Sequence, residues 1–220
     1  MISLFTTNDQ SHTLYNSELN ETYHSRNGAI EEAEYVYLKQ GFEPAANKKN
    51  SLNLLEIGFG TGLNAILTLQ KSNQLSVNCH YVSLETNPLP VELIQQLNYP
   101  QFLQPNSINT FNQIHQCAWN LDHALTPNFT LHKAEQSIHT FSTNQLFDVI
   151  YFDAFGPEKQ PDMWTNEVFE KMHQLTSTQG TLVTYSAKGE VKRTLKAVGY
   201  EVERLPGPPR KRHMLRAIKY

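Results

Sequence analysis

The stretch LLEIGFGTGLNA, residues 54–65, decides the fold, because an apolar run leads through three alternating glycines into a helical pattern. Together with Glu56 the glycines read E-x-G-x-G-x-G. Glycines in a strand-to-helix turn let the backbone approach a ligand closely, although such a turn also occurs without one. The dinucleotide fingerprint needs a glycine where this chain has Leu63, which disfavours an NAD-dependent oxidoreductase.

Length and composition favour one soluble domain with a small appendage in 220 residues. No apolar run approaches the roughly 20 residues of a membrane span, and the N-terminus lacks a signal-peptide core. Cys79 and Cys117 are too few for a disulfide framework or a zinc site, and the nine histidines lack metal-ligand spacing. We therefore expect a cytoplasmic protein without a membrane anchor or a metal.

Charge is distributed unevenly around a net value of −3. Residues 1–187 hold 8 Lys and Arg against 18 Asp and Glu, a balance of −10, whereas residues 188–220 hold 10 against 3, a balance of +7. A basic end on an acidic body indicates a local site for a polyanion, although any single lysine can be an ordinary solvated charge.

Strands and helices alternate after the first fifty residues. The predicted strands are 51–58, 78–86, 128–134, 147–155, 180–187, 200–205 and 213–220, and the predicted helices are 62–72, 90–97, 110–119, 166–175 and 190–198. This alternation predicts an α/β fold with a doubly wound parallel sheet. The last two strands have no helix between them, so we expect an antiparallel C-terminal hairpin. That hairpin on a Rossmann-like sheet is typical of class I S-adenosylmethionine-dependent methyltransferases.

The first fifty residues follow a different pattern. Residues 12–25 predict a hairpin and residues 29–42 a helix. We therefore divide the chain into an N-terminal extension, 1–50, that covers the cofactor site, and a methyltransferase domain, 51–220.

Carboxylates follow the predicted strands where ligands bind in open α/β sheets. Glu85 ends its strand and is placed to accept both ribose hydroxyls. Glu135 is placed either to contact the adenine amino group or to favour a helix N-terminus, and its alignment is open by one residue. A crevice rich in carboxylates suits a sulfonium cation, so S-adenosylmethionine is the predicted cofactor. Its predicted binding residues are Glu56, Gly58, Phe59, Gly60, Thr61, Gly62, Asn64, Glu85 and Glu135.

Asp153 ends the most apolar strand of the chain. We expect its carboxylate to be partly desolvated and to face the site; the alternative is a strand-end residue that caps a nearby helix.

A family resemblance emerges from several segments. DAFGPEKQPDMWT (153–165), GTLVTYSAKGEVKRTLKAVGYEV (180–202) and PGPPRKRHMLRA (206–217) resemble the methyltransferase domain of the MnmC family of bacterial tRNA wobble-uridine modification enzymes. So do ETYHS (21–25), GAIEEAEYVYL (28–38) and EIGFGTGLNA (56–65). The resemblance spans nearly the whole chain.

The resemblance implies methylation of the exocyclic amine of 5-aminomethyl-(2-thio)uridine in the tRNA anticodon loop. We expect the stand-alone form of this domain, often called MnmD, because no segment here can encode the FAD-dependent domain. The aminomethyl substrate then comes from upstream modification enzymes. For this reaction, Asp153 is the expected catalytic residue, which stabilises the positive charge that develops on the amine nitrogen. Whether Asp153 also accepts the proton of the amine stays open.

Aromatic and basic residues supply the predicted tRNA contacts. Tyr185 and Ser186 face either the uracil edge or solvent, and Trp164 either stacks on a splayed base with Phe155 or anchors its loop. The predicted substrate-binding residues are Tyr23, Ser25, Phe155, Lys159, Trp164, Tyr185, Ser186, Lys188, Lys192, Arg193, Arg210, Lys211 and Arg212, with His24 beside them. Two alternatives stay open: a class I methyltransferase acting on a small amine or a protein side chain, and a tRNA-binding module without catalysis.

Overall fold

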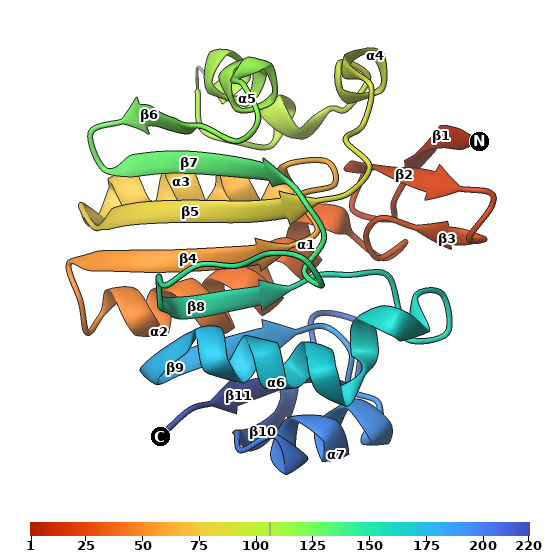
Figure 1. Ribbon diagram of the computed structural model, residues 1–220. Coiled ribbons are helices and arrows are strands. Elements are labelled where there is room, and N and C mark those ends of the chain that lie inside the picture. Colours follow the sequence, from red (N-terminus) through yellow and green to blue (C-terminus); the bar gives the residue numbers. More distant parts are fainter. Residues whose placement is uncertain (106) are drawn as a thin grey trace.

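A mixed sheet organises the residues that the computed structural model describes, 1–105 and 107–220. Its strands are β4 (Ser51–Ile57), β5 (Asn78–Glu85), β6 (Asp122–Thr126), β7 (Phe129–Glu135), β8 (Phe147–Phe152), β9 (Thr176–Thr184), β10 (Glu201–Pro206) and β11 (His213–Ile218). Across the sheet, the strand order in the described residues is β10-β11-β9-β8-β4-β5-β7-β6 (Figure 1). Parallel pairs join β7, β5, β4, β8 and β9. Strand β11 lies antiparallel between β9 and β10, so the predicted C-terminal hairpin is confirmed.

Helices cover both faces of the sheet (Figure 1). They are α1 (Ala29–Ala33), η1 (Glu34–Phe42), α2 (Glu43–Ala46), α3 (Leu63–Leu75), α4 (Val91–Ile94), η2 (Tyr99–Gln101), α5 (Ser107–Gln116), η3 (Pro161–Trp164), α6 (Asn166–Leu175) and α7 (Gly189–Ala197). Consecutive strand residues point to opposite faces, so Leu54 belongs to the core beneath α3 and η1, while Leu55 belongs to the core beneath α6 and α7. No helix in the described chain is long and apolar enough to cross a membrane.

Four local features differ from the sequence prediction. Strand β6 and the N-terminal strand β1 (Ile2–Thr6) were not predicted, because both are short and their burial does not alternate cleanly. The predicted helix over 90–97 is only the single turn α4. Strand β9 begins at Thr176, directly after α6, and Gly180 lies inside it at a register shift opposite β8.

The N-terminal segment forms a small sheet and a helical arm. The sheet contains β1, β2 (His12–Asn16) and β3 (Glu21–Thr22), and the predicted hairpin is its β2–β3 pair. Segment η1 is π-helical and packs against β8 and β9, where a Cβ on Gly41 would lie 3.0 Å from Val183. This packing brings the segment to the carboxyl edge of the large sheet. Its description as a separate unit ending at residue 50 stays a prediction.

The glycine loop is fixed between the ends of three strands. Gly58 N donates to Leu84 O at 3.0 Å, and Asp153 N donates to Ile57 O at 3.0 Å. Gly58 has a φ of 95°, and a Cβ there would lie 2.8 Å from Asp153 O. The loop therefore requires glycine at this position because of its own backbone neighbours.

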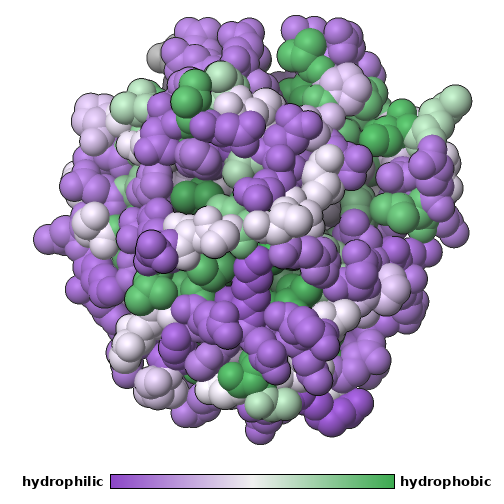
Figure 2. Space-filling view, in the orientation of Figure 1, coloured by the Kyte–Doolittle hydropathy of each residue, from purple (hydrophilic) through white to green (hydrophobic). Residues whose placement is uncertain are grey.

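Surface hydropathy varies across the face that Figure 2 displays. That face is mostly hydrophilic, and its apolar patches are small and separate. Patches of this kind are ordinary on protein surfaces and indicate no particular partner.

We predict that Gly58→Ala lowers the free energy of unfolding by about 1–3 kcal/mol, because alanine is strained at positive φ and its Cβ meets Asp153 O. Urea unfolding of the two proteins measures this difference. Gly189→Ala is the matched control, since that exposed glycine opens α7 and its nearest neighbour is the mobile end of Arg193. Equal stability losses in the two variants would contradict the explanation.

Candidate active site

A cavity of about 840 Å³ opens at the carboxyl edge of the sheet, next to the N-terminal sheet. The glycine loop, the ends of β5 and β8, and residues 21–26 form its walls. The predicted site residues that line it are Tyr23, His24, Ser25, Gly58, Phe59, Gly60, Thr61, Asn64, Glu85, Asp153, Phe155, Tyr185 and Lys211. The structure thus brings together the central part of the predicted site.

Glu85 presents a half-buried carboxylate to the cavity. One oxygen, Oε2, accepts from Gly60 N at 3.0 Å, and the other, Oε1, accepts from Thr86 N at 2.9 Å and Asn87 N at 2.8 Å. These backbone donors fix the side chain and occupy three of its about four acceptor positions, so one position on Oε2 stays free to accept a hydrogen bond from a ligand.

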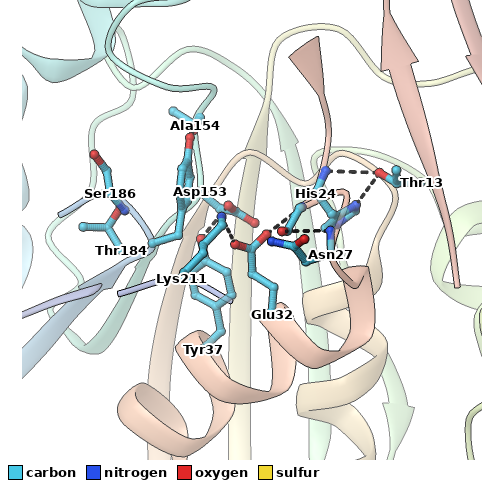
Figure 3. A network of polar contacts seen from close by, with 12 residues as sticks. Thr13, His24, Asn27, Glu32, Tyr37, Asp153, Ala154, Thr184, Ser186 and Lys211 are labelled. Carbon is cyan, nitrogen blue, oxygen red and sulfur yellow. Dashed lines mark hydrogen bonds and ion pairs between the residues drawn. The ribbon is translucent and has the colours of Figure 1, made fainter. Parts of the chain in front are cut away.

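Asp153 lies at the floor of the cavity, just after β8 (Figure 3). Its Oδ1 accepts from the Tyr37 hydroxyl at 2.5 Å, and its Oδ2 accepts from Asn64 Nδ2 at 2.8 Å. Burial raises the pKa of Asp153 to about 7, although the Tyr37 hydrogen bond acts in the opposite direction. The predicted desolvated carboxylate is therefore present, with two fixed donors.

Lys211 and Glu32 form an ion pair beside Asp153 (Figure 3). Ser25 N donates to the second oxygen of Glu32 at 2.8 Å, and Lys211 Nζ also lies 5.0 Å from the centre of the Tyr185 ring. The prediction that Lys211 belongs to a free phosphate surface therefore needs correction, because its ammonium turns into the cavity toward an acidic partner.

His24 connects the N-terminal sheet to the glycine loop. Its Nδ1 lies 3.0 Å from Thr13 Oγ1, and its Nε2 lies 3.4 Å from Thr61 Oγ1. Burial lowers the pKa of His24 to about 4, so the imidazole is neutral at pH 7. Nearby, the rings of Tyr23 and Phe155 meet edge to face at 5.0 Å, which closes one side of the cavity.

Glu56 and Gly62 lie behind the cavity wall. Glu56 is fully buried and accepts from Ser83 Oγ at 2.5 Å. The prediction that Glu56 contacts the cofactor directly is therefore corrected, because its side chain does not reach the cavity. Burial raises the pKa of Glu56 to about 8. Gly62 directly precedes α3 with a φ of 70° and faces the His115 imidazole, again behind the wall.

Three other predicted residues are also away from the cavity lining. Glu135 is exposed at the end of β7, whereas Gln136, one residue on, lines the cavity. Trp164 is buried and donates from Nε1 to Phe155 O at 2.8 Å, so it anchors its loop and offers no stacking face. Ser186 is 6% exposed and sits behind the wall, which corrects its assignment to the uracil edge.

The other basic residues of the predicted set lie outside the cavity lining. Lys188, at the start of α7, pairs with Glu158 of the loop that follows β8. Arg193, Arg210 and Arg212 are exposed, while Lys159 and Lys192 are half-buried. None of these six residues lines the cavity, so any contact that they make is to a ligand extending beyond it.

Two residues of this site escaped the sequence analysis, Glu32 and Tyr37. Both come from the N-terminal helical arm, where they are five positions apart. Glu32 lies in α1 and Tyr37 in η1, and residues five apart point to different sides of a regular α-helix, so the sequence pattern does not place both in the site. The run EEAEYVYL, residues 31–38, contains both residues, but nothing in their sequence spacing indicates that they line a site. No group of three or more His, Cys, Asp or Glu in the described chain is arranged to hold a metal ion.

Comparison with known proteins identifies a family and several relatives. The profile of a family described as "S-adenosyl-L-methionine-dependent methyltransferase" matches residues 97–220. The tRNA 5-methylaminomethyl-2-thiouridine biosynthesis bifunctional protein MnmC of Pseudoalteromonas atlantica is 33% identical, over 92% of this chain and 31% of that protein. The MnmC protein of an Azoarcus species is 31% identical, over 93% of this chain and 34% of that protein. The chain therefore spans about a third of the length of these relatives.

Solved structures share the fold. MNMC2 from Aquifex aeolicus aligns with a TM-score of 0.79 and 22% identity, covering 99% of this chain and 70% of that one. Spermidine synthase from Thermotoga maritima aligns with a TM-score of 0.57 and 16% identity, covering 96% of this chain and 69% of that one. At these sequence identities, the two matches show a shared fold and nothing beyond it.

Proposed function

Because the chain belongs to the family of S-adenosyl-L-methionine-dependent methyltransferases, we propose that it methylates the exocyclic amine of 5-aminomethyl-(2-thio)uridine at the wobble position of tRNA. The product is 5-methylaminomethyl-(2-thio)uridine, the nucleoside that the names of the MnmC relatives contain. The predicted cofactor is confirmed at the level of the family. The observation that carries the proposal is a desolvated carboxylate, Asp153, held by two donors at the floor of the cavity.

The cavity suits the cofactor of this family. When bound, S-adenosylmethionine supplies a methyl group on a positively charged sulfur. Glu85 is fixed by backbone donors and keeps one acceptor position, on Oε2, for a ribose hydroxyl. The remaining proposed cofactor contacts are Gly58, Phe59, Gly60, Thr61 and Asn64, which all line the cavity. The cavity lining holds more carboxylates than cations, with Glu85 and Asp153 among them, which favours a cationic ligand over a phosphate.

Asp153 acts on the amine of the substrate in this proposal. An alkyl amine has a pKa of about 10, so it arrives mostly as an ammonium ion, which an ionised Asp153 binds. Methylation needs the neutral amine, and it generates positive charge on nitrogen that the fixed carboxylate stabilises. Tyr37 and Asn64 hold the two carboxylate oxygens, so Asp153 needs little reorganisation during the reaction.

tRNA contacts fall into two groups in the proposal. Tyr23, Phe155 and Tyr185 line the cavity and would hold the flipped wobble base. The basic residues Lys159, Lys188, Lys192, Arg193, Arg210 and Arg212 lie outside it and would contact backbone phosphates of the anticodon stem-loop. We further propose that the protein works in the cytoplasm and that a separate upstream reaction supplies the aminomethyl group.

The experiment that tests the function uses tRNA from cells blocked at the aminomethyl stage. The protein is incubated with this tRNA and radiolabelled S-adenosylmethionine, and nucleosides are then separated. We expect label in 5-methylaminomethyl-(2-thio)uridine. Cofactor binding without label in tRNA would contradict the proposal and favour a small-amine or protein methyltransferase.

Glu85→Gln should weaken binding of S-adenosylmethionine by about 10–100-fold, because a hydrogen bond to a charged group is lost and a donor is turned toward Gly60 N. Calorimetric titration measures the affinity. Glu135→Gln, the same chemical change at an exposed strand end, should leave the affinity within about twofold. Equal losses in both variants would argue against a ribose contact by Glu85.

Asp153→Asn should lower kcat by at least about a hundredfold, because the amide carries no negative charge. In the unchanged protein, kcat/KM should rise with pH through about 7, since Asp153 is protonated below its pKa and ionised above it. Asp148→Asn, in the same strand and hydrogen-bonded to Asn53 N at 2.9 Å, is the control for loss of a carboxylate. Turnover of Asp153→Asn close to that of the unchanged protein would remove Asp153 from the mechanism.

Charge reversal of Lys192 and Arg193 together should weaken tRNA binding and lower the slope of its salt dependence by about two phosphate contacts. Filter binding at several salt concentrations measures both quantities. Lys48→Glu serves as the control, because this exposed lysine precedes β4 at the opposite edge of the sheet. A salt slope that stays unchanged in the double variant would place the phosphate contacts elsewhere.

A further inference from the structure

Lys211 places a cation in a cavity whose lining holds more carboxylates than cations. Its side chain is half-buried, and its ammonium group pairs with Glu32, whose side chain is only 9% exposed. The ammonium group also lies 5.0 Å from the centre of the Tyr185 ring, within range of a cation–π contact. An ammonium group has three N–H donors, and among the described residues Glu32 alone accepts a hydrogen bond from it. Donors of Lys211 therefore remain for a ligand in the cavity.

The strand order places Lys211 on the other side of Asp153 from the proposed cofactor contacts. Asp153 directly follows β8, which lies between β4 and β9 in the sheet. The glycine loop follows β4 and Glu85 ends β5, so both lie on one side of Asp153. Tyr185 directly follows β9, and Lys211 lies in the turn between β10 and β11, so both lie on the opposite side.

The Tyr185 ring fixes the place of the lysine within this side of the cavity. The Tyr185 hydroxyl donates to Ala154 O, one residue after Asp153, at 2.9 Å. The ring on which the ammonium group of Lys211 packs is therefore tied to the segment that carries Asp153. Figure 3 shows Lys211, Glu32 and Asp153 in one cluster. A carboxylate and an ammonium group thus face the same part of the cavity.

We propose that Lys211 selects the uracil ring of the substrate by donating a hydrogen bond to its O4 atom while Asp153 binds the aminomethyl group. This inference rests on the proposed methylation of 5-aminomethyl-(2-thio)uridine. The aminomethyl group is attached to C5, and O4 is attached to the neighbouring ring carbon. The oxygen or sulfur atom on C2 lies across the ring. A donor beside the carboxylate that binds the amine therefore meets O4.

A neutral carbonyl group suits this lysine better than a phosphate group does. Glu32 already offsets the charge of Lys211, and Asp153 adds a further negative charge on the same side of the cavity. Two carboxylates would repel a phosphate oxygen, whereas a carbonyl oxygen has no net charge and still accepts from an N–H group. The pair with Glu32 also reduces the repulsion between Lys211 and the ammonium form of the substrate. Glu32 is then a positioning residue for Lys211.

The position that Lys211 contacts is the one at which uracil and cytosine differ. Uracil carries the acceptor O4 there, and cytosine carries an amino group, which is a donor. Lysine offers donors and no acceptor, so an amino group in the same place would face another donor. Lys211 therefore excludes a cytosine ring that carries the same aminomethyl group.

Two tRNAs assembled by ligation test this selection, one with 5-aminomethyluridine and one with 5-aminomethylcytidine at the wobble position. The ratio of their kcat/KM values is measured with radiolabelled S-adenosylmethionine. The unchanged protein should prefer the uridine tRNA by at least about a hundredfold, because the cytidine tRNA loses a charged hydrogen bond and brings two donors together. In K211M the preference should fall to about tenfold or less. K71M is the matched control and should leave the ratio unchanged, because it breaks a half-buried pair, Lys71–Glu43 at 2.9 Å, outside the cavity lining.

A second variant separates recognition from stability. K211M leaves the buried Glu32 without its cation, which destabilises the protein. E32Q/K211M removes both charges, and its amide oxygen can still accept from Ser25 N. This variant should lose the preference for uridine as K211M does. A preference that stays unchanged in both variants would overturn the proposal, since a lysine that only stabilises the fold would slow the reaction of both tRNAs equally.

Titration with S-adenosylmethionine distinguishes the substrate from the cofactor as the partner of Lys211. The cofactor carries a carboxylate, which a lysine can also bind. We expect the affinity of E32Q/K211M for S-adenosylmethionine to stay within about twofold of that of the unchanged protein, because no hydrogen bond to the cofactor is lost. A loss of about tenfold or more would assign Lys211 to the cofactor and overturn the proposal.

The inference and the proposed function fail in different ways. If the unchanged protein labels neither tRNA, the wobble-uridine function is contradicted, and the role of Lys211 falls with it. If the unchanged protein labels both tRNAs at similar rates, the function stands and only the role of Lys211 is overturned.

Discussion

Partial burial of one carboxylate at the end of a parallel strand is the constraint on which this site depends. Asp153 lies where β4 and β8 end, with its backbone in contact with the position that a Gly58 side chain would take. Its side chain draws Tyr37 from the N-terminal arm and Asn64 from α3 into one network. Segment η1 and the start of α3 thus supply the two donors that this carboxylate requires, and the neighbouring loop requires glycine at position 58 because Asp153 O lies against it.

Electrostatic demands of opposite sign are separated in space. The cavity wall carries carboxylates suited to a cationic cofactor and amine, whereas six basic residues of the second half of the chain lie outside the cavity lining. Lys211 and Arg26 do line the cavity, and Lys211 does so with Glu32 as its partner. A uniformly basic surface would attract tRNA but repel the groups that react, so a local division of charge suits both steps.

Strongly patterned features of the sequence predicted the fold and half of the site. The unbroken apolar run of β8 and the strand-end rule placed Asp153 and Glu85 at one edge, and the missing helix before β11 predicted the hairpin. The sequence spacing of Glu56 and Trp164 did not reveal whether their side chains face the cavity or the core. Each is next in the chain to a residue that lines the cavity, Ile57 or Met163, and a shift of one residue changes the direction of the side chain. Glu32 and Tyr37 were missed because their contacts to Lys211 and Asp153 are made by the tertiary packing of α1 and η1.

The pair Glu32–Lys211 joins residues 179 positions apart in the chain. Contacts between such distant segments form only after a long loop has closed, and they form late during folding. Glu32 leaves the ribosome long before Lys211, so a growing chain holds a partly buried carboxylate that has no cation beside it until the last hairpin is made. The ion pair in the cavity wall therefore forms only after the turn between β10 and β11 has been synthesised, and a chain that stops before Lys211 lacks this pair.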